Sequence, residues 1–271
     1  MLVCQITDTH IKAGRRLAYR RVDTASMLED CVAAVARLDP APDVILLTGD
    51  LGDLGRPEEY AELKSLLAPL RAPIYAVPGN HDEREAMRAA FGAGGYLPAR
   101  GFLHYAVEDR PLRLIGLDTL LPGQGGGELC AERLAWVDRK LAERPDAPTL
   151  VFMHHLPFPT GIEHMDKLGL KGSEAFASIL ARHEQVVAVL CGHLHRSIQA
   201  QIGGRRVCTS PSPAHQVALD FRPGAPGGFR MEPPGYMLHR WSGGLLVSHV
   251  VTVGDHAGPF PFFDASGKLI D

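Results

Sequence analysis

Five short segments of this 271-residue chain concentrate carboxylate, amide and imidazole side chains. They are residues 8–10, 49–53, 79–82, 154–155 and 192–195. Oxygen and imidazole donors in this mixture suit Fe, Mn, Zn or Co. Each segment follows an apolar run, so the five can converge only if the fold brings several strand ends together. The pattern therefore predicts a two-metal hydrolase acting on phosphate esters.

The spacing within the segments favours convergence on metal ions. Asp8 and His10 lie two residues apart after a predicted strand, which would direct both side chains to one face. His193 and His195 repeat this spacing, and His154 follows another predicted strand. We therefore expect these side chains to lie at the carboxyl edge of a sheet, where open α/β folds bind their ligands.

Asp50 and Asn80 extend this donor set. The carboxylate of Asp50 can offer one oxygen to each of two cations about 3.5–4 Å apart. Asn80 offers a neutral carbonyl oxygen, which limits the charge of the site. Gly49 and Gly52 permit a tight turn and a close backbone approach around Asp50.

Each motif has an ordinary structural alternative when it is taken alone. Asp-x-His at a strand end is more often a cap or turn group, Asp50 could cap a helix, and Gly79-Asn80 could be a turn signal. Of the adjacent His154 and His155, either could be the metal ligand. The metal site is favoured because all five segments occur in order and each follows a predicted strand.

The elements that must position these segments alternate between short apolar strands and amphipathic helices. We predict helices at 21–38, 58–70, 83–91, 131–142 and 173–182, the last capped by Ser173. We predict strands at 2–7, 44–48, 74–77, 102–107, 112–117, 149–153, 186–191, 198–202, 206–209, 237–241 and 245–251. This order predicts one α/β domain over residues 1–271, a four-layer α/β/β/α sandwich of two mixed sheets flanked by helices. The late strands would form an antiparallel edge or a second sheet.

Three loops are candidates for shaping the mouth of a pocket. They are residues 123–127, 161–172 (which contain His164) and the Pro/Gly-rich insertion 223–234. The alternative for the insertion is a contact with another subunit.

Composition excludes several other classes of protein. A net charge of −3 and a pI near 6.5 leave no basic stripe for a long nucleic acid. No apolar stretch approaches the roughly 20 residues that span a bilayer, and no signal-like start is visible, so we expect a cytoplasmic protein without a membrane partner. The five cysteines form no Cys-x-x-Cys pair and are expected to be free thiols. The Gly-x-Ser-x-Gly and P-loop signatures are missing, which argues against serine hydrolases and P-loop enzymes.

The ordered motifs resemble those of the calcineurin-like metallophosphoesterase superfamily. The His-His-Leu-Pro run at 154–157 and the chain length are most similar to its class III cyclic-nucleotide phosphodiesterase and glycerophosphodiesterase branch. The resemblance extends from Gln5 to about His215. Beyond that, it implies that residues from about 216 to 271 form a cap or an oligomer contact, so we expect a homo-oligomer.

The resemblance also implies roles for the residues of the motifs. One metal would be bound by Asp8, His10, Asp50 and His195. The other would be bound by Asp50, Asn80, His154 and His193, which makes the first histidine of the 154–155 pair the ligand. His81, His215 and Asn80 would contact the reacting phosphate, and Asp53, Asp82 and His155 would orient ligands.

The expected activity is hydrolysis of small phosphodiesters, cyclic nucleotides or glycerophosphodiesters, by direct attack of a metal-bound hydroxide. The cofactor would be two divalent or trivalent transition-metal ions per chain, chosen from Fe, Mn, Zn and Co. The alternatives on the same site are a phosphomonoesterase, a phosphonate-ester hydrolase and a pyrophosphatase. A non-catalytic scaffold is a further alternative, but such scaffolds typically lose a ligand, and every ligand position is filled here.

Overall fold

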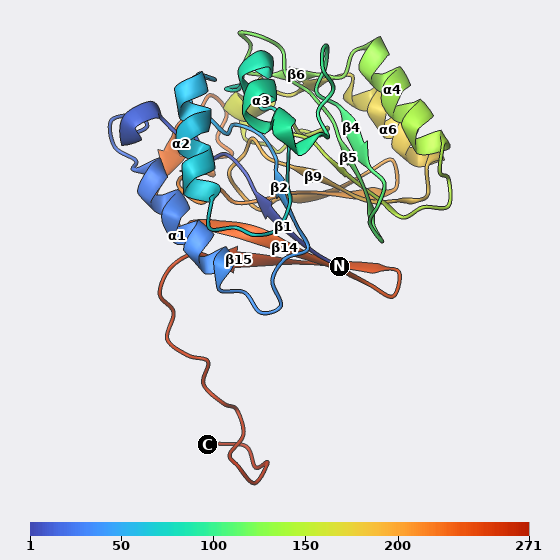
Figure 1. Cartoon of the computed structure of the whole chain (residues 1–271). Helices are drawn as coiled ribbons and strands as arrows, with labels where there is room; N and C mark the ends of the chain where they lie inside the picture. The colour runs from blue at the N-terminus through green and yellow to red at the C-terminus, as the bar shows by residue number, and fades with distance from the viewer. Residues whose placement is uncertain (271) are drawn as a thin grey trace.

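Two mixed β-sheets lie face to face at the centre of the computed structural model, which describes residues 1–270 (Figure 1). The first sheet has the order β15-β14-β1-β2-β3 and the second the order β10-β11-β9-β7-β5-β4. The first contains β1 (Leu2–Ile6), β2 (Val44–Leu47), β3 (Ile74–Ala76), β14 (Gly235–Ser242) and β15 (Leu245–Thr252). The second contains β4 (Tyr105–Val107), β5 (Arg113–Gly116), β7 (Thr149–Phe152), β9 (Val186–Cys191), β10 (Gln199–Ile202) and β11 (Arg205–Thr209).

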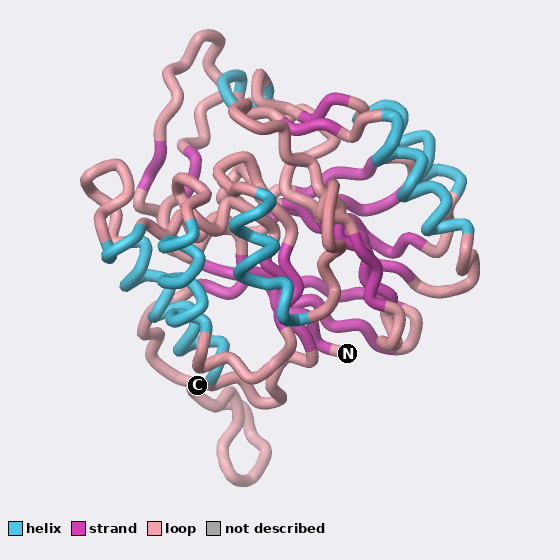
Figure 2. The backbone as a smooth tube through the Cα atoms, turned by 45° about the horizontal axis from the view of Figure 1, so that its top comes forward, coloured by secondary structure: helices cyan, strands magenta, loops and turns pink. Residues whose placement is uncertain are grey.

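Helices cover the outer face of each sheet, and Figure 2 shows them on opposite sides of the strands. The first sheet carries α1 (Thr24–Ala36), α2 (Pro57–Leu67) and α3 (Arg84–Phe91). The second carries α4 (Ala131–Ala142) and α6 (Ser173–Arg182). The predicted four-layer α/β/β/α sandwich is therefore confirmed.

Strand alternation explains why the fold has four layers. In β2, Val44 and Leu46 point into the core between the sheets, whereas Ile45 and Leu47 point toward the helices. The strands of the second sheet divide their side chains in the same way, as in the buried strand β9. Because successive side chains of a strand leave opposite faces, an apolar run must be covered on both sides.

Parallel pairing brings the chemically important segments to one edge. In the first sheet β1, β2 and β3 run parallel, and in the second β5, β7 and β9 do. Contacts between the sheets join their carboxyl ends: Gln5 Nε2 donates to Cys191 O over 2.9 Å, and His154 Nδ1 bonds Thr48 O at 2.8 Å. The ends of β1, β2, β7 and β9 therefore meet above the core between the sheets.

Several predicted boundaries were wrong for local reasons. The first helix begins at Thr24 instead of residue 21, because Asp23 caps it by accepting a hydrogen bond from Ser26 N. The cap of α6 is Gly172 at φ 87°, and Ser173 is the first helical residue. The late strands do not stay together, since β10 and β11 extend the second sheet while β14 and β15 extend the first.

Several short elements were not predicted from the sequence. They are β6 (Gly127–Glu128), β8 (Leu170–Lys171), β12 (Gln216–Val217), β13 (Phe229–Arg230), α5 (Glu163–Asp166) and the 3₁₀ turns Ala13–Arg15 and Gly92–Gly94. β6 pairs with β8, and β12 pairs with β13, so all three candidate loops contain ordered backbone pairing or a helical turn. These elements have only two to four residues, too few to show a hydrophobic period.

The C-terminal region has two parts. β14 lies between β15 and β1, so it is an integral strand of the first sheet. From residue 254 onward the chain runs away from the body of the fold (Figure 1). Over residues 1–270, none of the helices has the length and apolar character needed to cross a bilayer.

The cysteines differ sharply in their surroundings. All five are free, as predicted, and Cys4, Cys31, Cys191 and Cys208 are buried. Burial raises the pKa of these four thiols. Cys130 is partly exposed at the start of α4, where hydrogen bonds from Arg133 outweigh the effect of burial and lower its pKa.

We expect iodoacetamide to alkylate Cys130 before the other four thiols of the native protein, because the thiolate is the reacting form. The rate should rise at a lower pH than in the urea-unfolded chain, since folding lowers the pKa of this thiol. Peptide mass spectrometry over a pH series measures both effects. Cys130→Ser is the matched control, and early modification of a core cysteine would contradict the prediction.

Candidate metal centre

The seven predicted ligands converge at the shared edge of the two sheets. In one half of the cluster, His10 Nε2 lies 3.2 Å from His195 Nε2. His195 Nε2 lies 3.4 Å from Asp8 Oδ1, and His10 Nε2 lies 3.7 Å from Asp50 Oδ2. All four side chains are buried.

The other half is centred on His154. Its Nε2 lies 3.4 Å from Asp50 Oδ2, 3.2 Å from Asn80 Oδ1 and 3.2 Å from His193 Nδ1. Asp50 Oδ2 therefore lies near His10 in one half and near His154 in the other, which is the position that a bridging carboxylate requires.

These separations are also those expected between ligands of one metal ion. Ligand atoms about 2.1 Å from one ion lie about 3.0 Å apart at a right angle and about 3.4 Å apart at the tetrahedral angle. Most of the distances fall in or near this range, including the contact of His10 Nε2 with His195 Nε2 at 3.2 Å. Unprotonated nitrogens repel one another at such a distance, and a cation between them removes that repulsion.

Three of the four histidines use their other ring nitrogen in a hydrogen bond that holds a fixed orientation, and the fourth, His10, places that nitrogen near a carboxylate. The Nδ1 atoms of His154 and His195 face backbone carbonyls, of Thr48 at 2.8 Å and of His215 at 2.9 Å. His193 Nε2 faces Leu168 O at 3.2 Å. His10 Nδ1 lies 3.3 Å from Asp53 Oδ1. Acceptors of this kind fix the tautomer and leave the opposite nitrogen free for a metal.

Strained backbone accompanies these ligands. Asp8, His10, Asp50, His193 and His195 all have positive φ angles, between 43° and 72°. They are five of the eight non-glycine residues with positive φ among residues 1–270. Non-glycine residues keep a positive φ only where the surrounding structure holds them in it, and such residues are concentrated at functional sites.

This backbone corrects one step of the sequence argument. β1 ends at Ile6 and β9 at Cys191, so Asp8, His10, His193 and His195 lie beyond the strands. Strand alternation therefore does not direct these side chains. Their convergence comes from left-handed turns, and the equal spacing of the two motifs reflects the same turn geometry at two strand ends.

Two glycines allow the close approach of the segments. A Cβ atom at Gly79 would lie 2.1 Å from Asp50 Oδ1, and one at Gly49 would lie 2.5 Å from His154 Nδ1. Gly49 also has a φ of 95°, which residues with a Cβ rarely adopt. The glycines of these motifs make room for the ligand side chains.

Asp53, Asp82 and His155 occupy supporting positions. Asp53 contacts Lys12 as well as His10. Asp82 accepts hydrogen bonds from the backbone N–H groups of Leu51, Gly52 and Gly79. His155 Nδ1 bonds Thr119 Oγ1 at 2.8 Å, and its Nε2 lies 3.4 Å from Gly125 O, so both nitrogens of His155 already have partners.

The buried charges of the cluster are strongly coupled. Burial by itself would raise the pKa of Asp50, but the attraction of His154 and His81 outweighs it and holds that pKa well below its usual value. Burial would lower the pKa of His154, and Asp50 instead raises it to about 9. Asp50 and His154 therefore stabilise each other's charged forms at the centre of the cluster.

A cavity of about 250 Å³ opens onto these ligands. His81 and His215 line it, as predicted. His81 N donates to Asp50 Oδ1 over 2.9 Å, and its Nδ1 bonds Asp53 O at 2.8 Å. The ring of His215 lies 4.6 Å from that of His195. Both histidines are therefore beside the cluster.

Sequence reasoning missed two aromatic residues of this cavity. Tyr19 and Phe229 line it, with rings 5.2 Å apart, and pack against His215 at 5.3 and 5.0 Å. Tyr19 lies in a tight turn with Arg20, both at positive φ, in a sequence without the glycine or asparagine that signals such turns. Phe229 belongs to the insertion 223–234, which therefore shapes the cavity.

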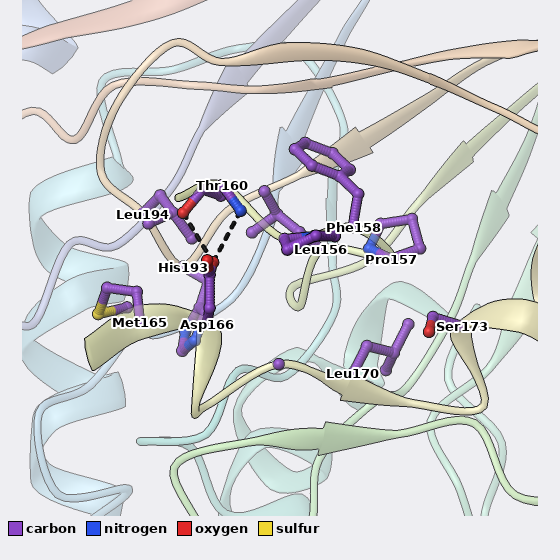
Figure 3. Close-up of a pocket in the computed structure, with 12 residues that line it drawn as sticks. Leu156, Pro157, Phe158, Thr160, Met165, Asp166, Leu170, Ser173, His193 and Leu194 are labelled. Atoms are coloured by element: carbon purple, nitrogen blue, oxygen red, sulfur yellow. Dashed lines mark hydrogen bonds between the residues drawn. The ribbon is translucent and has the colours of Figure 1, made fainter. Parts of the chain in front are cut away.

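A second cavity, of about 190 Å³, adjoins the first, and Figure 3 shows the residues that line it. Apolar side chains such as Leu156, Phe158 and Leu194 line it together with polar ones such as Thr160 and Asp166. Met165 and His193 line both cavities, so the two cavities adjoin at these side chains.

Comparison with known proteins agrees with this geometry. The model of the calcineurin-like phosphoesterase family matches residues 1–197. The chain is 41% identical over 273 residues to "Probable glycerophosphodiester phosphodiesterase GpdQ" of Arcobacter nitrofigilis, with all of both chains covered. It is 35% identical to "3',5'-cyclic adenosine monophosphate phosphodiesterase CpdA" of Pseudomonas aeruginosa, covering 89% of this chain and 84% of the relative.

A solved structure shows the same fold. It is a dimetal phosphatase from Danio rerio, with a TM-score of 0.63 and 15% identity, covering 94% of this chain and 99% of that one. The matching family model, the relatives and the ordered metal-binding motifs agree, and the chain belongs to the calcineurin-like phosphoesterase family.

Proposed function

We propose that this protein is a metal-dependent phosphodiesterase that hydrolyses small phosphodiesters, either glycerophosphodiesters or cyclic nucleotides. The observation that carries this proposal is the pair of buried donor groups that share Asp50 beside one open cavity. The names of the relatives, glycerophosphodiester and cyclic adenosine monophosphate phosphodiesterases, support the same class of substrate.

The proposed ligands form two sets of four. One is Asp8, His10, Asp50 and His195, and the other is Asp50, Asn80, His154 and His193. Two ions of Fe, Mn, Zn or Co, when bound, would lower the pKa of a coordinated water and neutralise phosphate oxygens. Asp53 and His155 would keep the ligand rings oriented through the contacts described above, and Asp82 would fix the backbone around Asp50.

We assign proton transfer to His81 and hydrogen bonding to His215. A carbonyl accepts at His81 Nδ1, so Nδ1 carries a proton and Nε2 is the atom left to serve the departing alkoxide. Burial and the neighbouring His195 and His10 lower the pKa of His215 to about 2. His215 is therefore neutral near pH 7 and suits a hydrogen bond to a phosphate oxygen better than proton donation.

The charge of the cavity favours diesters over monoesters. No lysine or arginine is among the described residues that line it. A diester carries a single negative charge, which two cations can neutralise, whereas monoesters and pyrophosphate carry more. The half-exposed Tyr19 and the adjacent Phe229 add an apolar wall that fits an esterified alcohol.

A substrate comparison tests the proposal. With added Mn²⁺ or Co²⁺, kcat/KM for bis(p-nitrophenyl) phosphate should exceed that for p-nitrophenyl phosphate. Glycerophosphoethanolamine and cyclic AMP should then identify the preferred alcohol. Faster hydrolysis of the monoester would instead support the phosphomonoesterase alternative. The homo-oligomer, the cytoplasmic location, the single domain and the cap role of the C-terminal strands remain predictions from the sequence.

A further inference from the structure

The α5 turn holds one histidine over the mouth of the metal-facing cavity. His164 and Met165 of α5 line this cavity together with Leu168. His164 belongs to neither proposed ligand set. Figure 3 shows Met165 and Asp166 of the same segment, which line the second cavity.

Hydrogen bonds on both sides fix the position of α5. Asp166 Oδ1 accepts from Thr160 N over 2.7 Å and from Thr160 Oγ1 over 2.8 Å, and its Oδ2 accepts from Gly161 N over 2.9 Å. Glu163 Oε2 accepts from Gly224 N over 2.6 Å, which joins α5 to the insertion that carries Phe229. These contacts hold the backbone of His164 between two loops.

The imidazole of His164 has an unused hydrogen-bonding group. Its Nδ1 is covered and has no partner. A covered N–H without an acceptor is costly, which favours the tautomer with the proton on Nε2. Gly227 confines the ring, because a Cβ atom there would lie 3.1 Å from His164 Cδ2. His164 is thus a confined imidazole in the cavity wall, with Nε2–H as the donor left for a ligand.

We propose that His164 is a specificity-determining residue that donates a hydrogen bond to a hydroxyl group of the substrate alcohol. The inference rests on the proposed phosphodiesterase function. The other polar side chains that line the cavity are the metal-binding cluster, His81 and His215, which face the phosphate, and Tyr19. Tyr19, Val217 and Phe229 supply apolar surface around the alcohol. His164 therefore selects polyhydroxylated alcohols, such as glycerol or ribose, over alkyl groups of the same size.

Two diesters that differ only in hydroxyl groups test this role: methyl glycerol phosphate and methyl propyl phosphate. The wild type should prefer the glycerol diester. His164→Ala should reduce the ratio of their kcat/KM values roughly fivefold to tenfold, the effect of one lost hydrogen bond, mainly through KM. His164→Gln, which retains a donor, should recover part of the ratio. Phosphorus NMR follows both reactions.

Two glycines provide a second pair of variants. Gly227→Ala should displace the ring of His164 and lower the same ratio. Gly92→Ala lies outside the cavity, and a Cβ atom there meets nothing within 4 Å, so this variant should keep the ratio. An unchanged ratio in His164→Ala, with an active wild type, would overturn the role of His164 alone. A metal-loaded wild type inactive on every diester would overturn the proposed function, and this inference with it.

Discussion

Asp50→Ala is expected to remove more than one metal ion per chain and to lower kcat on the order of a thousandfold or more. The reason is that Asp50 Oδ2 lies 3.7 Å from His10 Nε2 and 3.4 Å from His154 Nε2, so one carboxylate serves both halves of the cluster. Loss of the carboxylate also leaves His154 buried without its counter-charge. Elemental analysis of the purified variant, together with kcat for bis(p-nitrophenyl) phosphate, measures both effects.

Two variants control for this result. Asp50→Asn keeps one oxygen donor and should retain more metal than Asp50→Ala. Asp138→Ala removes a carboxylate that pairs with Arg182 and His183, both outside the cluster, and should keep the wild-type metal content. Circular dichroism establishes that the variants are folded. A single tightly held ion that survives in Asp50→Ala would refute the two-metal centre.

His81→Ala is expected to slow turnover about 10²–10⁴-fold while leaving the metal content near that of the wild type. Its ring is held by Asp53 O and contributes no atom to either proposed ligand set. Because His81 would protonate the departing oxygen, the loss should be largest for the most basic alkoxides. A series of aryl and alkyl diesters, compared in wild type and variant, gives this leaving-group dependence.

His154→Ala provides the contrast. Its Nε2 faces three neighbouring donor atoms, so its removal should reduce metal content and activity together. Excess Mn²⁺ should recover part of the activity of His154→Ala and none of that of His81→Ala. If His81→Ala lost equal activity on every leaving group, a role for His81 in protonating or stabilising the alkoxide would be wrong.

Much of the fold followed from local pattern. Apolar runs such as Val44–Leu47 are buried on both faces. A continuous run of apolar residues therefore indicates a strand that is covered by a layer on each side. The ends of the helices were predicted less accurately. The start of α1 depends on the cap at Asp23, and the start of α6 depends on the cap at Gly172. The short strands β6, β8, β12 and β13 exist only through their pairing partners, which a local pattern does not contain.

The sequence by itself determined which side chains could form the metal centre. The metal-binding side chains and the glycines of the five segments can be read directly from the sequence. Gly79 shows why a glycine is needed beside the ligands, because a Cβ atom there would collide with Asp50. Only the tertiary structure decided how these side chains meet. Asp8 and His195 are brought together by the packing of the two sheets against each other, and both have left-handed backbone that directs their side chains into the cluster. Only the tertiary structure shows the walls of the cavity as well. Tyr19, His164 and Phe229 come from three segments that are far apart in the sequence, and no local pattern encodes the contacts between those segments.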